Sequence, residues 1–179
     1  DLLGSSIGSF RHACFAQRDP KAALARFAEG YVAQSYAGTP TPDAISQESE
    51  RILDHFLGET GGREIVENPR LRSHVVAARF RRERGLDRGN RFRLQLAHAA
   101  LRNTLSRRAL FGALERVLFA SGESEPAHAP TIAFDDGPTL RAPLTPDNLR
   151  KALLASGSIP LVMAGVRDVE GAAGTLFDG

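Results

Sequence analysis

The sequence of 179 residues is poor in several residue types, and each shortage argues against a class of protein. It has one cysteine, Cys14, so an intramolecular disulfide is excluded and a reducing compartment is permitted. It has no tryptophan and 7% aromatic residues, and no aromatic pattern interleaves with its arginines, so we expect no nucleic-acid partner. Because we find no leader segment and no apolar run of about eighteen residues, we expect a cytoplasmic protein, with peripheral membrane contact as an alternative.

The composition is nevertheless that of a folded domain. Hydrophobic residues make up 42% of the chain, well outside the range of disordered segments, and the length suits one core. Lysine occurs twice among the 23 basic residues, and seven arginines fall within positions 79–93. Guanidinium groups suit phosphate, so this cluster predicts either contact with an anionic phospholipid surface or, as we prefer, an ordinary solvated segment.

Turn residues and apolar spacing predict mostly helices, with a few strands between them. Helices are expected over 7–18, 19–36, 41–58, 61–69 and 145–156, with two more within 90–120. Strands are expected over 71–80, which is apolar on both faces as in a parallel sheet, and as a hairpin over 131–134 and 140–143. This alternation predicts an α/β fold with a central sheet between helices. The helices within 90–120 would cover the sheet, act as a lid or pair in a dimer.

The first residues have the G-x-S-x-G spacing of a nucleophile elbow: Gly4-Ser5-Ser6-Ile7-Gly8. In such an elbow the serine stands on a tight strand-to-helix turn, where side chains at the two glycine positions would collide with the turn. Leu2-Leu3 before the motif predicts a strand end, and 7–18 predicts a helix with one apolar face. The motif therefore predicts Ser6 as a nucleophile, and an ordinary glycine-serine loop is the alternative.

A serine hydroxyl needs a base to take its proton, and the usual base, histidine, has no well-placed candidate here. All five histidines precede Asp178, whereas in α/β-hydrolases the histidine follows the acid. Triads of Asp54 with His74, or of Asp87 with His98, stay open without a supporting loop signal. We expect these histidines to be structural or surface residues.

Three segments together resemble the patatin-like phospholipase family. They are the elbow, the stretch Leu154-Ala155-Ser156-Gly157-Ser158-Ile159-Pro160, and the closing Phe177-Asp178-Gly179. The resemblance implies a serine-aspartate dyad without histidine, formed by Ser6 and Asp178, with Gly179 as the glycine of a D-G motif. It also implies a three-layer α/β/α domain with a mainly parallel sheet, an acyl-serine intermediate, and no cofactor.

The function that this resemblance implies is that of a lipid acyl hydrolase, of phospholipase A or lysophospholipase type. A non-lipid esterase or an acyltransferase on the same dyad is one alternative, and a catalytically silent membrane- or partner-binding module is another. In the family a glycine-rich oxyanion loop precedes the elbow, so we expect 1–179 to be one patatin-like domain without that loop, incomplete at both ends. No metal is expected, because Asp135 and Asp136 stand before Gly-Pro in ordinary turn chemistry.

Overall fold

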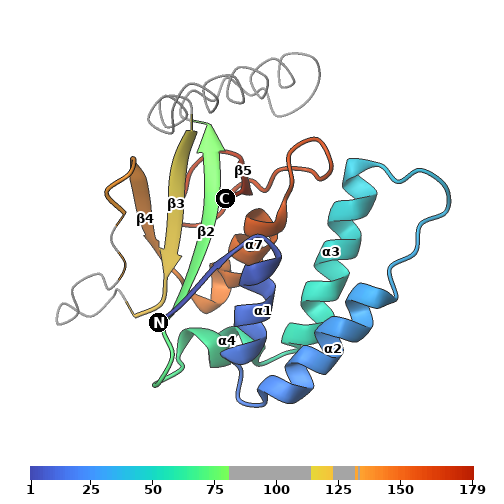
Figure 1. The fold of residues 1–179 in the computed structure, drawn as a ribbon, viewed down its shortest axis with the longest axis horizontal. Helices are drawn as coiled ribbons and strands as arrows, with labels where there is room; N and C mark the ends of the chain where they lie inside the picture. The colour runs from blue at the N-terminus through green and yellow to red at the C-terminus, as the bar shows by residue number, and fades with distance from the viewer. Residues whose placement is uncertain (81–113, 123–131, 133) are drawn as a thin grey trace.

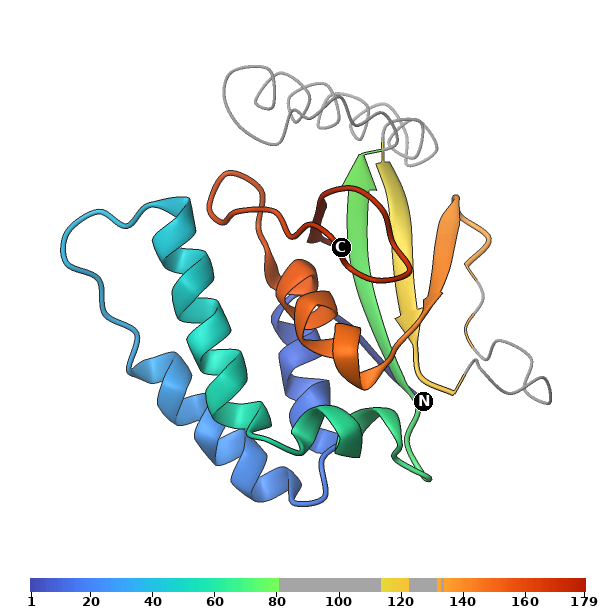
Figure 2. The same ribbon diagram turned by 180° about the vertical axis from the view of Figure 1, so that it is seen from behind.

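The computed structural model describes residues 1–80, 114–122, 132 and 134–179 (Figure 1). Their elements in chain order are β1 (Leu2–Ser5), α1 (Ile7–Phe15), α2 (Pro20–Val32), α3 (Pro42–Leu57), α4 (Gly61–Val66), β2 (Ser73–Phe80), β3 (Leu114–Ala120), β4 (Thr139–Pro143), α7 (Pro146–Gly157) and β5 (Leu176–Asp178). Strands β2, β3 and β4 form one side of the molecule and α2 and α3 the other, with α1 and α7 between them (Figure 1 and Figure 2). Among the residues described, no helix combines the length and apolarity needed to cross a membrane.

Three helices begin where the sequence places their caps. The Asp19 side chain accepts a hydrogen bond from the Ala22 N–H at 3.0 Å at the start of α2. Thr41 caps α3 in the same way, and Thr145 forms a reciprocal capping box with Asn148 at the start of α7. Proline follows each cap, where its fixed φ suits the first helical turn and its missing N–H costs nothing.

The sheet is organised around β2. Strand β3 runs antiparallel along one edge of β2, and β4 runs parallel to β3. The other edge of β2 is shared, because β1 pairs with its first half in parallel and β5 pairs with its second half antiparallel. Ser5 lies opposite Val76 and Asp178 lies opposite Ala77, so the last residues of β1 and β5 meet end to end. The predicted α/β class is confirmed, in a mixed sheet with helices packed around it.

The helix expected to end near residue 120 is wrong over 114–120, because those residues form strand β3. Leu114, Val117 and Leu118 have helical spacing, but the last four residues of β3 are a continuous buried apolar run. Such a run suits a strand covered on both faces, and spacing alone does not separate the two structures. Residues 90–113, and with them the question of a lid, lie outside the described residues.

The expected hairpin is also wrong. Strand β4 pairs in parallel with β3, and Ile132 and Phe134 lie outside any strand. The Asp136-Gly137-Pro138 turn therefore leads into β4 without joining it to an antiparallel neighbour. In place of a tight hairpin, the chain uses the longer connection from β3 that a parallel pair requires.

Aromatic packing fixes α1 against its neighbours. The Phe10 ring lies 6.2 Å from that of Phe27 on α2 and 6.0 Å from that of Phe56 on α3, measured between centroids. The last turn of α7 passes close by, because a Cβ added to Gly157 would lie 3.2 Å from the Phe10 ring. These contacts hold the start of α1 and the end of α7 side by side.

Candidate active site

Ser6 occupies the turn between β1 and α1, as expected for an elbow. Its φ is 54° and its ψ is −139°, a conformation that residues other than glycine rarely adopt. Such strain persists only where the surrounding structure holds it, and it is concentrated at functional sites. The strand, turn and helix that the motif requires are all present.

The two motif glycines differ in what they avoid. A Cβ added to Gly4 would lie 2.2 Å from Nδ1 of His12 and 2.5 Å from Cα of Ser9, so the elbow needs glycine there. The same expectation is wrong for Gly8, where an added Cβ meets nothing within 4 Å. Gly8 belongs to the first turn of α1, and the space that a side chain there would occupy is open.

The structure brings the two predicted catalytic residues together. Oγ of Ser6 donates a hydrogen bond to Oδ2 of Asp178 at 2.7 Å, across 172 positions of sequence. The bond is direct, so no imidazole lies between hydroxyl and carboxylate. The hydrogen bond forms because β1 and β5 share one edge of β2. Strand β5 runs toward the end of β1, which places Asp178 beside the elbow.

Two buried serines hold the backbone of Ser6, and neither role was predicted from the sequence. Ser156, in the last turn of α7, accepts a hydrogen bond from the Ser6 N–H at 3.1 Å. Ser9, one turn into α1, donates through its hydroxyl to the Ser6 carbonyl oxygen at 2.7 Å. Both side chains are fully buried. The only available signal was that Ser156 stands in the stretch that carries the family resemblance.

Backbone contacts also hold Asp178 and Gly179 in place. The Asp178 N–H donates to the carbonyl oxygen of Ser158 at 2.9 Å, which joins β5 to the end of α7. Gly179 approaches the backbone of β2 closely, since an added Cβ would lie 2.9 Å from Cα of Ala77. The Ser5 hydroxyl donates to the Gly179 carbonyl oxygen and connects the two strand ends a second time. The glycine of the D-G motif is therefore required by its close approach to the sheet.

The surroundings make Asp178 a better base than a solvated aspartate. Burial raises the pKa of the Asp178 carboxyl, while the hydrogen bonds from the Ser6 hydroxyl and the Gly179 N–H oppose that rise. Desolvation favours the protonated form of a carboxyl group, and here it is the largest influence. A carboxylate with a raised pKa accepts a proton from a hydroxyl more readily.

The histidine triads find no support in the described residues. His74 is buried, and its Nε2 lies 3.3 Å from Oδ1 of Asp1, whereas Asp54 forms an ion pair with Arg150. The alternative of Asp87 with His98 lies outside the described residues. His12 is buried beneath Gly4, with neither ring nitrogen hydrogen-bonded to the described part of the chain. Its pKa is lowered to about 4, first by burial and second by the nearby His74.

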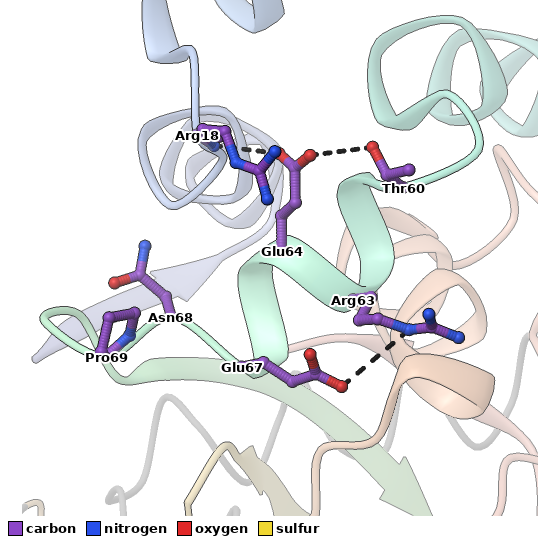
Figure 3. Close-up of a pocket in the computed structure, with 7 residues that line it drawn as sticks. All are labelled: Arg18, Thr60, Arg63, Glu64, Glu67, Asn68 and Pro69. Atoms are coloured by element: carbon purple, nitrogen blue, oxygen red, sulfur yellow. Dashed lines mark hydrogen bonds and ion pairs between the residues drawn. The ribbon is translucent and has the colours of Figure 1, made fainter.

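A polar pocket of about 460 Å³ lies beyond the other end of α1. Figure 3 shows its lining residues: Arg18, Thr60, Arg63, Glu64, Glu67, Asn68 and Pro69. Glu64 accepts hydrogen bonds from the Arg18 N–H at 3.0 Å and from the Thr60 hydroxyl at 2.8 Å. Arg63 and Glu67 lie 3.9 Å apart, so both carboxylates of the pocket have partners within it. No lining residue belongs to the dyad, and we assign the pocket no part in the chemistry.

Neither a scan of protein-family models nor comparisons with curated proteins and with solved structures gives a match for this chain. Within residues 1–80, 114–122 and 134–179 there is also no group of three or more histidine, cysteine or acidic side chains placed to hold a metal ion. The functional argument therefore depends on the geometry of the Ser6–Asp178 pair and on the motifs around it.

Proposed function

We propose that this chain is a serine hydrolase of lipid acyl esters, in which Ser6 is the nucleophile and Asp178 is the base. The observation that carries the proposal is the 2.7 Å hydrogen bond from Oγ of Ser6 to Oδ2 of Asp178, formed on a strained elbow. A half-buried carboxylate that accepts the hydrogen bond of a half-buried serine hydroxyl is an arrangement that activates the hydroxyl. The choice of lipid esters is supported by the resemblance to patatin-like phospholipases.

Acylation begins when Oγ of Ser6 attacks the carbonyl carbon of the ester. The serine proton moves to Oδ2 of Asp178, and the electron pair of the carbonyl double bond moves to oxygen. The N–H of Ile7, directly after the nucleophile, is the donor that an elbow offers to that oxyanion. When the tetrahedral intermediate collapses, the bond to the alcohol oxygen breaks and Asp178 returns its proton to the leaving alcohol.

Deacylation repeats these steps with water. Asp178 takes a proton from a water molecule as that water attacks the acyl-serine carbonyl, and it gives the proton to Oγ of Ser6 as the carboxylic acid leaves. Carboxylate is a weaker base than imidazole. The dyad therefore suits esters, whose alcohol leaves more easily than an amine.

A fluorophosphonate probe tests the nucleophile directly. The expected result is covalent labelling of the parent protein, loss of labelling in Ser6→Ala, and parent-level labelling in the control Ser49→Ala. Ser49 is a matched control because its hydroxyl bonds to the Ile45 carbonyl within α3, on a separate helix. Labelling that persists in Ser6→Ala, or a parent protein that is never labelled, would contradict the proposal.

The substrate class needs a second assay. Hydrolysis of long-chain phospholipid in vesicles is compared with hydrolysis of a short-chain soluble ester, using the parent and Ser6→Ala. We expect both activities to depend on Ser6. Activity on the soluble ester with none on the phospholipid would assign the dyad to a non-lipid esterase.

A further inference from the structure

Next to the dyad, the chain exposes a cluster of large aliphatic side chains, which we call the apolar turn (Ile159–Val162). Ile159 is 47% exposed, Leu161 51% and Val162 45%. No charged residue occurs from 157 to 166, a span that consists of glycine, serine, proline, methionine and aliphatic residues. Single exposed aliphatic residues are common on protein surfaces, whereas three within four uncharged positions require an explanation.

The apolar turn has a defined structure. The N–H groups of Val162 and Met163 both donate to the Ile159 carbonyl oxygen, at 3.1 and 2.9 Å. Met163 is buried, and the N–H of Ala164 donates to the hydroxyl of Ser46 on α3 at 2.9 Å. The turn is therefore anchored behind its exposed side chains, which fixes the surface that they present.

Leu161 carries two costs at once. Its φ is 70°, in the left-handed region that glycine or asparagine enters more easily than leucine. Half of its side chain is in solvent, so burial in the core does not repay the backbone strain. The backbone strain is repaid if the exposed leucine side chain is buried in an apolar environment outside the protein.

The position of the turn indicates what it contacts. Ser158, the residue before Ile159, accepts a hydrogen bond from the Asp178 N–H at 2.9 Å, and Ser156 accepts one from the Ser6 N–H. The apolar turn thus begins at the edge of the dyad. A protein partner seated there would stand next to the nucleophile and restrict substrate entry, whereas a lipid surface is itself the source of the ester.

We propose that the apolar turn inserts into the surface of a lipid aggregate and holds the dyad against it. The inference rests on the proposed function, and it adds to it the surface through which the protein meets its substrate. The aliphatic side chains enter the acyl region, while the uncharged flanks avoid the cost of taking ions out of water. The interaction needs no anionic headgroup, so it extends to zwitterionic phospholipid.

The test uses vesicles of phosphatidylcholine and a double variant, Leu161→Asn with Val162→Ser. Asparagine accepts the left-handed backbone, so this change removes apolar surface without adding strain. Val32→Ser is the matched control, because Val32 is 83% exposed at the end of α2. Vesicle binding by co-sedimentation is measured in a Ser6→Ala background, which separates binding from turnover.

We expect the double variant to bind vesicles about tenfold more weakly than the parent, and Val32→Ser to bind as the parent does. With Ser6 present, hydrolysis of a soluble short-chain ester should stay within about twofold of the parent in both variants. Equal vesicle binding by the double variant and the parent, or an equal loss in Val32→Ser, overturns the proposal. The proposal is also overturned if the double variant loses soluble-ester hydrolysis and vesicle binding to the same extent, because the turn would then act by changing the dyad. If vesicle binding depends on the apolar turn but the protein that retains Ser6 is not labelled by the fluorophosphonate, the proposed hydrolase is refuted and the apolar turn remains supported as a lipid-binding surface.

Discussion

The two glycines of one motif are expected to respond to alanine with opposite signs. In Gly4→Ala the new methyl group would lie 2.2 Å from Nδ1 of His12 and 2.5 Å from Cα of Ser9. Backbone atoms of α1 cannot move aside without moving the helix, so β1 and α1 must separate. In Gly8→Ala the methyl group enters open space at the first turn of α1.

The magnitudes follow from these contacts. Overpacking of this kind costs about 3 kcal/mol of unfolding free energy for Gly4→Ala, or a Tm lower by roughly 6–12 °C in a chain of this length. Gly8→Ala gains up to about 1 kcal/mol, because alanine loses less backbone entropy in a helix than glycine does. The shift of α1 in Gly4→Ala also moves Ser6 away from Asp178, and fluorophosphonate labelling should slow with it.

Chemical denaturation of the parent and both variants measures these differences, with labelling rates recorded on the same samples. Agreement requires Gly4→Ala to be the least stable of the three proteins and Gly8→Ala to be at least as stable as the parent. If the two variants were equally stable within about 0.5 kcal/mol, or if their order were reversed, the elbow geometry described above would be wrong.

Three other changes test the site. Asp178→Asn should abolish labelling yet raise stability at pH 7. Because the pKa of Asp178 is raised in the folded state, the parent loses stability as pH rises above 3.8 and the carboxyl group ionises. Denaturation measured across pH should show that this loss is absent in the variant. Ser156→Ala leaves the Ser6 N–H without its acceptor, and we expect labelling about tenfold slower, with rescue by Ser156→Cys; an unchanged labelling rate would assign Ser156 to packing alone. The lowered pKa of His12 means that the parent loses on the order of 3 kcal/mol of stability as pH falls from 6.5 to about 4, and His12→Leu should be spared that loss; parallel pH profiles of unfolding for the two proteins would refute this.

Features that depend on neighbouring residues could be predicted from the sequence. The caps at Asp19, Thr41 and Thr145 are satisfied within three residues of themselves, and each helix begins at the predicted place. The position of the elbow is equally local, since Ser6 lies between the strand before it and the helix after it. The pairing of Ser6 with Asp178 was predicted from a resemblance, because neither residue carries a local signal for the other.

Tertiary structure decided the features that depend on strand pairing and on contacts distant in sequence. Strand β5 runs antiparallel beside β2 and stops where β1 stops, and this register delivers Asp178 to the elbow. The formation of a strand, β3, by the apolar run near residue 120 depends on its pairing with β2. The supporting role of Ser156 likewise depends on Ser6, which lies far away along the chain. Alternation and spacing report which face of an element is apolar, but strand order and register follow from the free energy of the whole packed sheet.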